Sequence, residues 1–386
     1  MVGDSATLVD LFAGCGGLAL GFHQAGFETI CANELHPDPA LTYSRNLLVE
    51  SEESMKVGPI KKVMSNKKIE EFGLHNSEID CVAGGPPCQG FSNAGRGDPD
   101  DPRNSLFKDY LRVVRKIRPK SVVFENVPGF ANRYGKGLRG RLIRDLSRMG
   151  YATDYSVLQA HNYGVPQLRK RFFCIGIHKD WCEPGEVTLP EPTWTMKEIE
   201  SKLTTRKAIG DLDVYSQRGG YGTGEVDGPE KYLKPARTAF QRDMRVVSGT
   251  TKKGFTWNTK IPKHTKKVSR RMRKMQEGST RESFIDTELE TNKLSQRVLN
   301  PNRYPRITVV SIPDDYIHYN RQLPRTLSVR ECARLQTFPD HFRFYGKRTT
   351  GGERRRIDVP QYTQVGNAIP PRIAEEIGRK IKSIIS

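Results

Sequence analysis

Short apolar runs alternate with amphipathic segments over the first half of the chain. The apolar runs have the length and composition of buried strands, whereas the segments between them carry apolar residues at helical spacing and end near glycine or proline. This alternation predicts an α/β domain built on a central sheet. The expected strands are Leu8–Phe12, Phe27–Ala32, Ile79–Ala83, Ser121–Phe124, Tyr155–Gln159 and Phe172–Ile177, and the expected helices are Leu18–Ala25, Leu106–Ile117 and Gly140–Met149.

A glycine-rich turn lies between the first expected strand and the first expected helix. Gly14 and Gly16 stand in this turn, and Glu34 follows the second strand. Strand, glycine turn, helix, strand and acid form the pattern of a mononucleotide-binding half, in which the carboxylate can accept from both hydroxyls of a ribose. Ala19 replaces the third glycine of the complete fingerprint, so an ordinary turn and a dinucleotide site are both compatible with the pattern.

A cysteine follows the third expected strand at a rigid turn. Residues Gly84–Pro87 are two glycines and two prolines, which end the strand abruptly and deliver Cys88 to its carboxyl end. Open α/β sheets bind their ligands at this edge. The glycine-containing segment from Gln89 to Asn104 then predicts a closing loop behind a positioned nucleophile. The alternative is a buried structural cysteine at a turn.

The charge balance indicates a polyanionic partner. Lys and Arg number 63 against 44 Asp and Glu, a net charge of +19. Nucleic acid is the usual partner of such a chain, although charge alone does not exclude a merely basic protein. The segment Lys252–Lys274 holds ten Lys or Arg and no acid, with Phe255 and Trp257 interleaved. It lies in a poorly periodic region from about Trp181 to Asn320, and its alternative is a solvated surface loop.

The cysteines and histidines argue against several classes of protein. The seven cysteines contain no C-x-x-C pair and the eight histidines no paired ligand spacing, so we expect neither a disulfide framework nor a metal site. An odd cysteine count without a signal peptide favours a reducing cytoplasm. Because no apolar run approaches membrane-spanning length, we expect no membrane partner.

Several segments resemble the ordered motifs of the cytosine-C5 DNA methyltransferases. The resemblance covers roughly residues 7–178 and 322–386, in the family's order. It implies a Rossmann-like methyltransferase sheet with a smaller, irregular, β-rich target-recognition domain. The matching segments are Phe12–Gly17, Pro86–Gln89, Glu125–Val127, Gln167-x-Arg169-x-Arg171, Arg325–Asp340 and Gln364–Pro371.

The resemblance implies duplex DNA as substrate and 5-methylcytosine as product. Cytosine C5 is a poor nucleophile, and addition of the Cys88 thiolate to C6 would make it an enamine carbon. A protonated Glu125 would donate to N3. By the resemblance Arg171 holds O2 and Arg169 braces Glu125, although the sequence alone also supports the exchanged roles. The target base must leave the stack, and the segment Gln89–Asn104 is the expected clamp.

S-adenosyl-L-methionine is the cofactor that the resemblance implies. Phe12 matches the family's aromatic residue under the adenine, Gly14 and Gly16 its methionine-side turn, and Glu34 its ribose ligand. Pro59 stands where the family often places an Asp that accepts from the adenine amino group, so this chain departs from the pattern there. The other expected cofactor contacts are Ile60, Pro86, Leu106 and Asn367.

The resemblance also divides the chain. Residues 1–185 and 321–386 are expected to form the catalytic domain, and residues 186–320 the target-recognition domain. The first motif begins by residue 7, which predicts a prokaryotic enzyme. We also expect a cytoplasmic monomer that is associated with the nucleoid through DNA. It is either solitary or part of a restriction–modification system whose endonuclease it does not contact. The expected DNA contacts are Gln89, Ser92, Lys252, Lys253, Lys266 and Lys267.

Two other functions share parts of the pattern. The tRNA cytosine-C5 methyltransferases also carry Pro-Pro-Cys and Glu-Asn-Val, but the Cys-Phe-Thr tripeptide of that branch is absent here. A catalytically inactive DNA-binding regulator would not need Cys88, Glu125, Arg169 and Arg171 together. Methyl transfer to duplex DNA or to tRNA separates the three.

Overall fold

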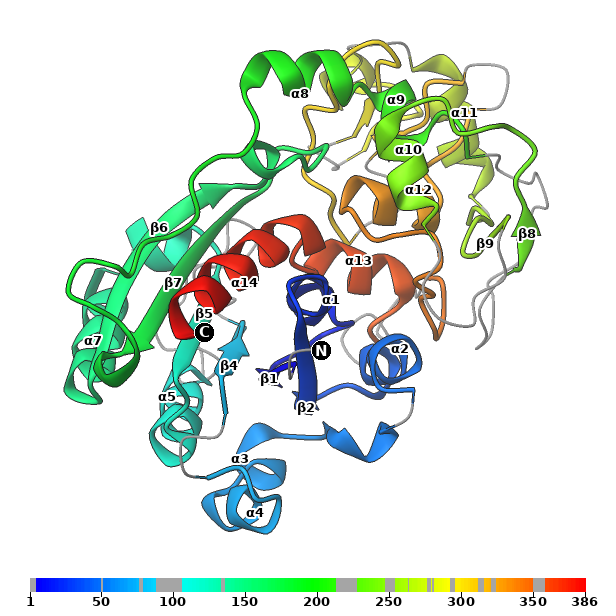
Figure 1. The fold of residues 1–386 in the computed structure, drawn as a ribbon. Helices are drawn as coiled ribbons and strands as arrows, with labels where there is room; N and C mark the ends of the chain where they lie inside the picture. Colours follow the sequence, from blue (N-terminus) through cyan, green and yellow to red (C-terminus); the bar gives the residue numbers. More distant parts are fainter. Residues whose placement is uncertain are drawn as a thin grey trace. The chain divides into compact units, whose positions relative to one another are not determined.

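The chain divides into two compact units. Unit 1 comprises residues 1–163, 169–192 and 369–386, and unit 2 comprises residues 164–168 and 193–368. Figure 1 shows the elements along the chain. The computed structural model describes residues 5–49, 51–75, 79–87, 106–132, 136–212, 228–246, 254–262, 264–275, 279, 281–291, 296–311, 316–320, 324–349 and 358–386.

A seven-stranded sheet forms the centre of unit 1, in the order β3-β2-β1-β4-β5-β7-β6. The strands from β3 to β5 in this order are parallel, whereas β7 is antiparallel to both β5 and β6. The carboxyl ends of β1, β2, β4 and β5 therefore share one edge. The strands are β1 Ala6–Leu11, β2 Phe27–Glu34, β3 Met55–Val57, β4 Cys81–Gly84, β5 Ser121–Asn126, β6 Tyr151–Gln159 and β7 Lys170–His178.

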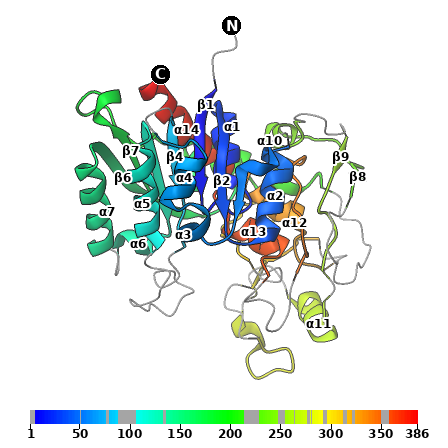
Figure 2. The same ribbon diagram turned by 90° about the horizontal axis from the view of Figure 1, so that it is seen from below.

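Helices cover both faces of this sheet (Figure 2). Leu8 of β1 packs with helices α1, α2 and α14, whereas its neighbours Val9 and Leu11 pack with α5 and α7. Burial of both faces explains why the strands are continuous apolar runs. The helices of unit 1 are α1 Gly17–Gln24, α2 Pro37–Leu47, α3 Ile60–Val63, α4 Asn66–Glu71, α5 Leu106–Ile117, α6 Gly129–Asn132, α7 Lys136–Arg148 and α14 Pro371–Ile385, with the short turns η1 Glu52–Ser54, η4 Ala160–Tyr163 and η5 Lys179–Trp181.

The last helix of the chain lies alongside the first. Figures 1 and 2 show α14 next to α1. A Cβ on Gly21 of α1 would lie 2.6 Å from Ala374 Cβ, and one on Gly378 of α14 would lie 2.9 Å from Ala25 Cβ. The two helices therefore approach at a distance that only glycine permits at these positions.

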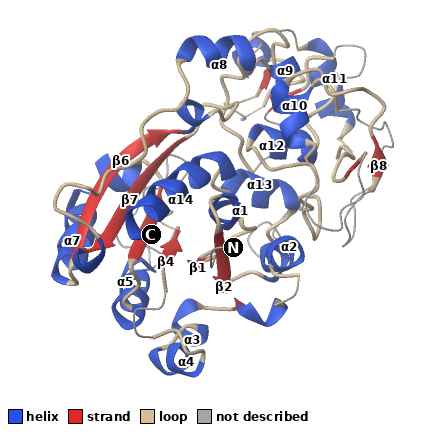
Figure 3. Cartoon of the chain, viewed as in Figure 1, coloured by secondary structure: helices blue, strands red, loops and turns tan. Residues whose placement is uncertain are grey.

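Unit 2 is irregular, with short helices joined by loops (Figure 3). Its described strands are two residues long, so the prediction of a β-rich domain is not confirmed over the described part of this unit. Its helices are α8 Met196–Lys202, α9 Thr205–Ile209, α10 Ala239–Met244, α11 Lys266–Lys274, α12 Val329–Leu335 and α13 Gln361–Asn367, with the turn η6 Arg281–Phe284. Its strands are β8 Glu230–Lys231, β9 Phe255–Thr256, β10 Arg297–Val298 and β11 Tyr316–Ile317.

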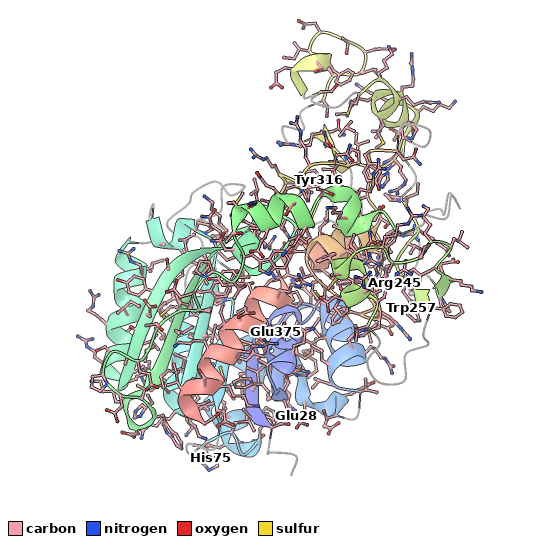
Figure 4. The ribbon with its side chains drawn as sticks, turned by 45° about the horizontal axis from the view of Figure 1, so that its top comes forward. Glu28, His75, Arg245, Trp257, Tyr316 and Glu375 are labelled. Carbon is pink, nitrogen blue, oxygen red and sulfur yellow. The ribbon has the colours of Figure 1, made fainter. Side chains whose placement is uncertain are left out.

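Buried arginines of α12 organise unit 2. Ser328 and Glu331 form the capping box that the sequence predicts at the start of this helix. Arg334 is fully buried and pairs with Asp211 at 2.7 Å and with Asp340 at 2.5 Å. Arg245, whose side chain is labelled in Figure 4, also pairs with Asp211. Ionic and hydrogen-bonded contacts thus join segments that have few apolar residues of their own.

No helix in the described part of the chain is both long and apolar enough to cross a membrane.

Candidate active site

The turn after β1 has the geometry of a cofactor cradle. Phe12, Gly14 and Gly16 all have positive φ, which only glycine adopts without strain. A Cβ on Gly16 would lie 2.6 Å from Leu47 Cδ1, so no side chain fits there. A Cβ on Gly14 would meet no atom of the described residues within 4 Å. Gly14 therefore leaves open space above the turn, where a ligand could approach the backbone.

Glu34 closes this turn from the end of β2. Its Oε2 accepts from the Gly14 amide at 2.9 Å, and its Oε1 accepts from the His36 amide at 2.9 Å. Burial raises the pKa of this carboxyl, and the His36 and Gly14 amides partly offset that rise. Each carboxylate oxygen has a second lone pair, so Glu34 keeps acceptor capacity toward a ribose.

Three apolar side chains that are predicted to contact the cofactor belong to one hydrophobic cluster or pack against it. Phe12 and Leu106 pack against the core between the sheet and α5, and Ile60 is buried within it. Pro59 precedes α3 and offers no side-chain acceptor. Asn33 Nδ2 holds the preceding backbone through Lys56 O at 2.9 Å and Gly58 O at 3.1 Å. These residues fit the adenosine half of a nucleoside cofactor.

Asp10 is a buried carboxyl beside the glycine turn, within the otherwise apolar strand β1. The sequence pattern did not single it out. Its hydrogen-bond partner is Tyr43, which in turn meets Thr29 Oγ1 at 3.1 Å, and Thr29 meets His23 Nε2 at 2.8 Å. Burial raises the pKa of Asp10 to about 8. The only signal in the sequence is a charged residue inside a strand that is otherwise apolar.

A second group of predicted residues meets at the end of β5. Glu125 is 9 % exposed, and its Oε1 lies 3.0 Å from Arg171 Nε on β7. Burial raises the pKa of Glu125, while the charges of Arg171 and Arg169 lower it in part. The ion pair in this structure is formed by Arg171, and the fully buried Arg169 acts on the carboxyl as a nearby charge.

The turn that precedes Cys88 lies against this group. A Cβ on Gly85 would lie 2.7 Å from Glu125 Oε2, so glycine is required there. Asn126 Nδ2 donates to Pro86 O at 2.9 Å, which fixes the turn to the end of β5. Pro86 is buried and Pro87 is exposed.

The remaining predicted residues are placed as follows. Asn367 is exposed at the end of α13 in unit 2, where its Oδ1 accepts from Ser311 Oγ at 3.1 Å. Lys266 and Lys267 are exposed at the start of α11. The predicted nucleophile Cys88 and the predicted DNA contacts Gln89, Ser92, Lys252 and Lys253 lie outside the described residues.

The sequence model of the C-5 cytosine-specific DNA methylase family matches residues 6–383. The chain belongs to this family. As a member of it, the protein is an S-adenosylmethionine-dependent DNA methyltransferase. The family assignment and the Rossmann-like fold predicted from the sequence motifs are both confirmed.

The relatives extend over nearly the whole chain. The methylase is 34% identical to the type II methyltransferase M.DdeI of Desulfomicrobium norvegicum, over 97% of this chain and 88% of that protein. It is 30% identical to the type II methyltransferase M.AgeI of Thalassovita gelatinovora, over 98% and 99%. An E. coli prophage protein assigned as a DNA modification methyltransferase has a similar crystal structure, with a TM-score of 0.73, 25% identity and coverage of 98% and 99%.

Proposed function

We propose that this methylase transfers a methyl group to C5 of one cytosine within a specific duplex sequence, through a covalent bond between Cys88 and C6 of the base. The observation that carries this mechanism is the arrangement around Glu125. A buried carboxyl with a raised pKa, held by Arg171, lies against the turn that leads to the cysteine. A proton donor and a nucleophile are thereby supplied from neighbouring strands of one sheet.

The steps balance with these residues. The Cys88 thiolate forms a bond to C6, and the C5=C6 electrons move through the ring toward N3, which takes the proton of Glu125. C5 is then nucleophilic and forms its bond to the methyl carbon, whose bond to the sulfonium sulfur of the donor would break and leave the electron pair on that sulfur as a neutral thioether. The C5 proton leaves to solvent, the Sγ–C6 bond breaks, and N3 returns its proton to Glu125. The Cys88 thiolate is restored. S-adenosylmethionine supplies the methyl group when bound.

The raised pKa of Glu125 supports its role as a donor. A carboxyl of ordinary pKa is ionised near pH 7 and has no proton to give. Burial favours the neutral acid, and the nearby charges of Arg171 and Arg169 offset part of that effect. Arg171 or Arg169 would hold O2 of the base.

The cofactor is proposed to lie over the glycine turn of unit 1. Glu34 would accept from the ribose hydroxyls, and Gly14 and Gly16 would admit the methionine half. Phe12, Ile60, Leu106 and Pro86 would surround the adenine and the methyl-bearing sulfur. Asn367 is proposed as a further contact.

Target recognition is proposed to lie in residues 186–320. The exposed Lys266 and Lys267 on α11 suit phosphate contacts, as do Lys252 and Lys253 earlier in the same run, and phosphate contacts position a protein on DNA without reading its sequence. Gln89 and Ser92 would contact the DNA around the flipped base. Exchanging residues 186–320 for those of a relative should change the methylated sequence, as mapped by bisulfite sequencing, and leave the chemistry intact.

The type II relatives support a place in a restriction–modification system, with a solitary methylase as the alternative. We propose a monomer that works in the cytoplasm without contact to the endonuclease. The direct test is transfer of a labelled methyl group to duplex DNA and to tRNA, followed by nucleoside mass spectrometry. We expect 5-methylcytosine in DNA alone. Product in tRNA alone, or in neither, would contradict the proposal.

A further inference from the structure

Gln167 belongs to the Gln-x-Arg-x-Arg motif but has no role in the chemistry proposed above. It is 0 % exposed, and all of its amide contacts are within unit 2. Its Nε2 donates to Leu335 O at 2.9 Å and to Gln336 Oε1 at 2.7 Å. Its Oε1 accepts from the Val309 amide at 3.0 Å. A side chain with every hydrogen fixed in this way defines both its own position and that of its partners.

Gln336 continues the same chain of amides. It is also 0 % exposed, at the end of α12. Its Nε2 donates to Val365 O at 2.6 Å and to Ala368 O at 3.2 Å, at the end of α13. Two glutamines therefore connect the segment 307–311, the end of α12 and the end of α13 through buried hydrogen bonds.

Backbone contacts hold residues 164–168 to the same segment. The Leu168 amide donates to Ile307 O at 2.7 Å, and the Tyr304 hydroxyl donates to Val165 O at 3.0 Å. Thr308 Oγ1 donates to Leu168 O at 2.5 Å, and Tyr316, labelled in Figure 4, donates to Thr308 O at 2.5 Å. Five residues of chain are thus fixed to the recognition region.

The segment 307–311 also contacts the end of α13. A Cβ on Gly366 would lie 2.5 Å from Ser311 N, so the backbones touch there. Ser311 Oγ donates to Asn367 Oδ1. One segment of unit 2 therefore holds both the start of the arginine motif and the residue proposed to contact the cofactor.

Arg169 follows this anchored segment directly in the chain. Two residues of extended chain span at most about 7 Å, so the backbone of Arg169 has little freedom relative to that of Gln167. Past this point the Arg169 carbonyl accepts from the Ala160 amide at 2.8 Å within unit 1, and Arg171 reaches Glu125. The amide chain can therefore act on the reaction through these arginines.

We propose that Gln167 and Gln336 are positioning residues. Through their hydrogen bonds with the segment 307–311 of the recognition region, they anchor the backbone from which Arg169 and Arg171 follow. This proposal rests on the proposed function, because the arginines matter through Glu125 and the base. Mispositioning of a catalytic group by about 1 Å can cost 10²-fold in rate, so the effect should fall on methyl transfer.

The test compares Gln167→Met and Gln336→Met with Gln241→Met. Gln241 is the matched control, since it is 3 % exposed, lies in unit 2 and also makes three side-chain hydrogen bonds. We expect all three variants to lower the melting temperature. Single-turnover methyl transfer should fall about 10²-fold for Gln167→Met and Gln336→Met, with the Kd for DNA little changed, and stay within about threefold of wild type for Gln241→Met.

The double variant Gln167→Met/Gln336→Met gives a readout that a merely structural role would not produce. If the two amides act as one unit, the double variant should transfer methyl groups no more slowly than either single variant. A rate within threefold of the Gln241→Met rate for both single variants would overturn the positioning role. If Gln167→Met does not fold, Gln336→Met decides, because it leaves residues 164–168 unaltered. A wild type that transfers no methyl group to DNA would contradict the proposed function itself, and with it this proposal.

Discussion

Glu331 and Glu125 are both buried and paired with arginine, but their pKa values are shifted in opposite directions. In unit 2, Glu331 accepts hydrogen bonds from Arg325 Nη1 at 2.7 Å and Nη2 at 2.8 Å, and from the Ser328 amide at 2.7 Å. In unit 1, the contact of Glu125 is with Arg171 Nε. Burial on its own would raise the pKa of each carboxyl. The charges of Arg325 and His318 and the hydrogen bonds from Arg325 and Ser328 lower the pKa of Glu331 to about 2. The pKa of Glu125 stays raised.

The difference lies in how many lone pairs are satisfied. A carboxylate that accepts a bidentate arginine and an amide is stabilised as the anion. A carboxyl whose burial is offset by fewer donors and charges has a raised pKa and keeps its proton to a higher pH. The arrangement at Glu331 suits a structural ion pair, whereas the arrangement at Glu125 suits a carboxyl that donates a proton. Burial and the presence of arginine do not by themselves distinguish a catalytic carboxyl from a structural one.

The largest effect is expected where the network is fully satisfied. Arg334→Met would leave Asp211 and Asp340 buried without this partner, and breaking a buried pair costs roughly 3–5 kcal/mol. We expect a decrease of this size in the free energy of unfolding, measured by urea denaturation. The control is Arg306→Met, which removes an exposed pair with Glu200 at 3.4 Å and should cost at most about 1 kcal/mol. Equal decreases in both would show that the buried network contributes no more than a surface pair.

Glu125→Gln tests the other half of the comparison. The amide keeps the shape of the side chain but cannot deliver a proton, so kcat should fall by about 10²-fold or more. Stability should change little, because the amide keeps the shape of the carboxyl and an oxygen that can accept from Arg171 Nε. Glu331→Gln should show the reverse pattern, with lower stability and a nearly normal kcat per folded molecule. A Glu125→Gln enzyme within a few-fold of wild type would remove this residue from the mechanism.

The pH dependence of the two carboxyls should also differ in sign. The pKa of Glu331 is about 2 in the folded protein against 4.5 for a free Glu. Its contribution to stability is therefore present above pH 4.5 and is lost as the pH falls toward 2. The raised pKa of Glu125 acts oppositely, since stability declines as the pH rises from 4.5 through that pKa. Denaturation of the wild type and of each Gln variant across about pH 3–8 should show these two slopes, and matching slopes would refute the contrast.

The smallest effect, a weaker binding of DNA, is expected from replacing the exposed lysines of α11. Replacing Lys266, Lys267 and Lys274 by Gln should weaken binding to all DNA sequences alike. The log–log salt slope should shrink by about 0.9 for each DNA phosphate that the variant no longer neutralises. Lys61, Lys62 and Lys67 of unit 1 are likewise exposed and serve as the control set. A change in the methylated sequence instead of the salt slope would mean that these lysines read bases.

Much of unit 1 could be predicted because its local and overall signals agree. The apolar runs predict strands that end at Phe12, Ala32, Ala83 and Phe124, and the observed strands end within two residues of these positions. Their ends share one edge because parallel strands have the same direction. The antiparallel insertion of β7 between β5 and β6 could not be predicted from the pattern, since strand order depends on long-range pairing. Neither could the direct contact of Arg171 with Glu125, because neighbouring side chains of one motif look alike in sequence.

Unit 2 was predictable only in outline. Its helices α8 to α11 are short, so periodicity does not mark them, and each buries only a few apolar residues. Arg271 illustrates the limit. It lies within the basic run expected to contact phosphates, yet it is 4 % exposed and donates to Leu289 O at 2.7 Å. Likewise, nothing in the sequence marks Gln167 and Gln336 as partners.

The most direct test of the central claim is covalent trapping on duplex DNA that carries 5-fluorocytosine at the target position. Fluorine at C5 cannot leave as a proton does, so the bond between the enzyme and C6 should persist. We expect a stable adduct whose digest places the modified peptide at Cys88, no adduct from Cys88→Ala although that variant still binds DNA, and slow adduct formation by Glu125→Gln. An adduct on another cysteine, or full turnover by Cys88→Ala, would contradict the account.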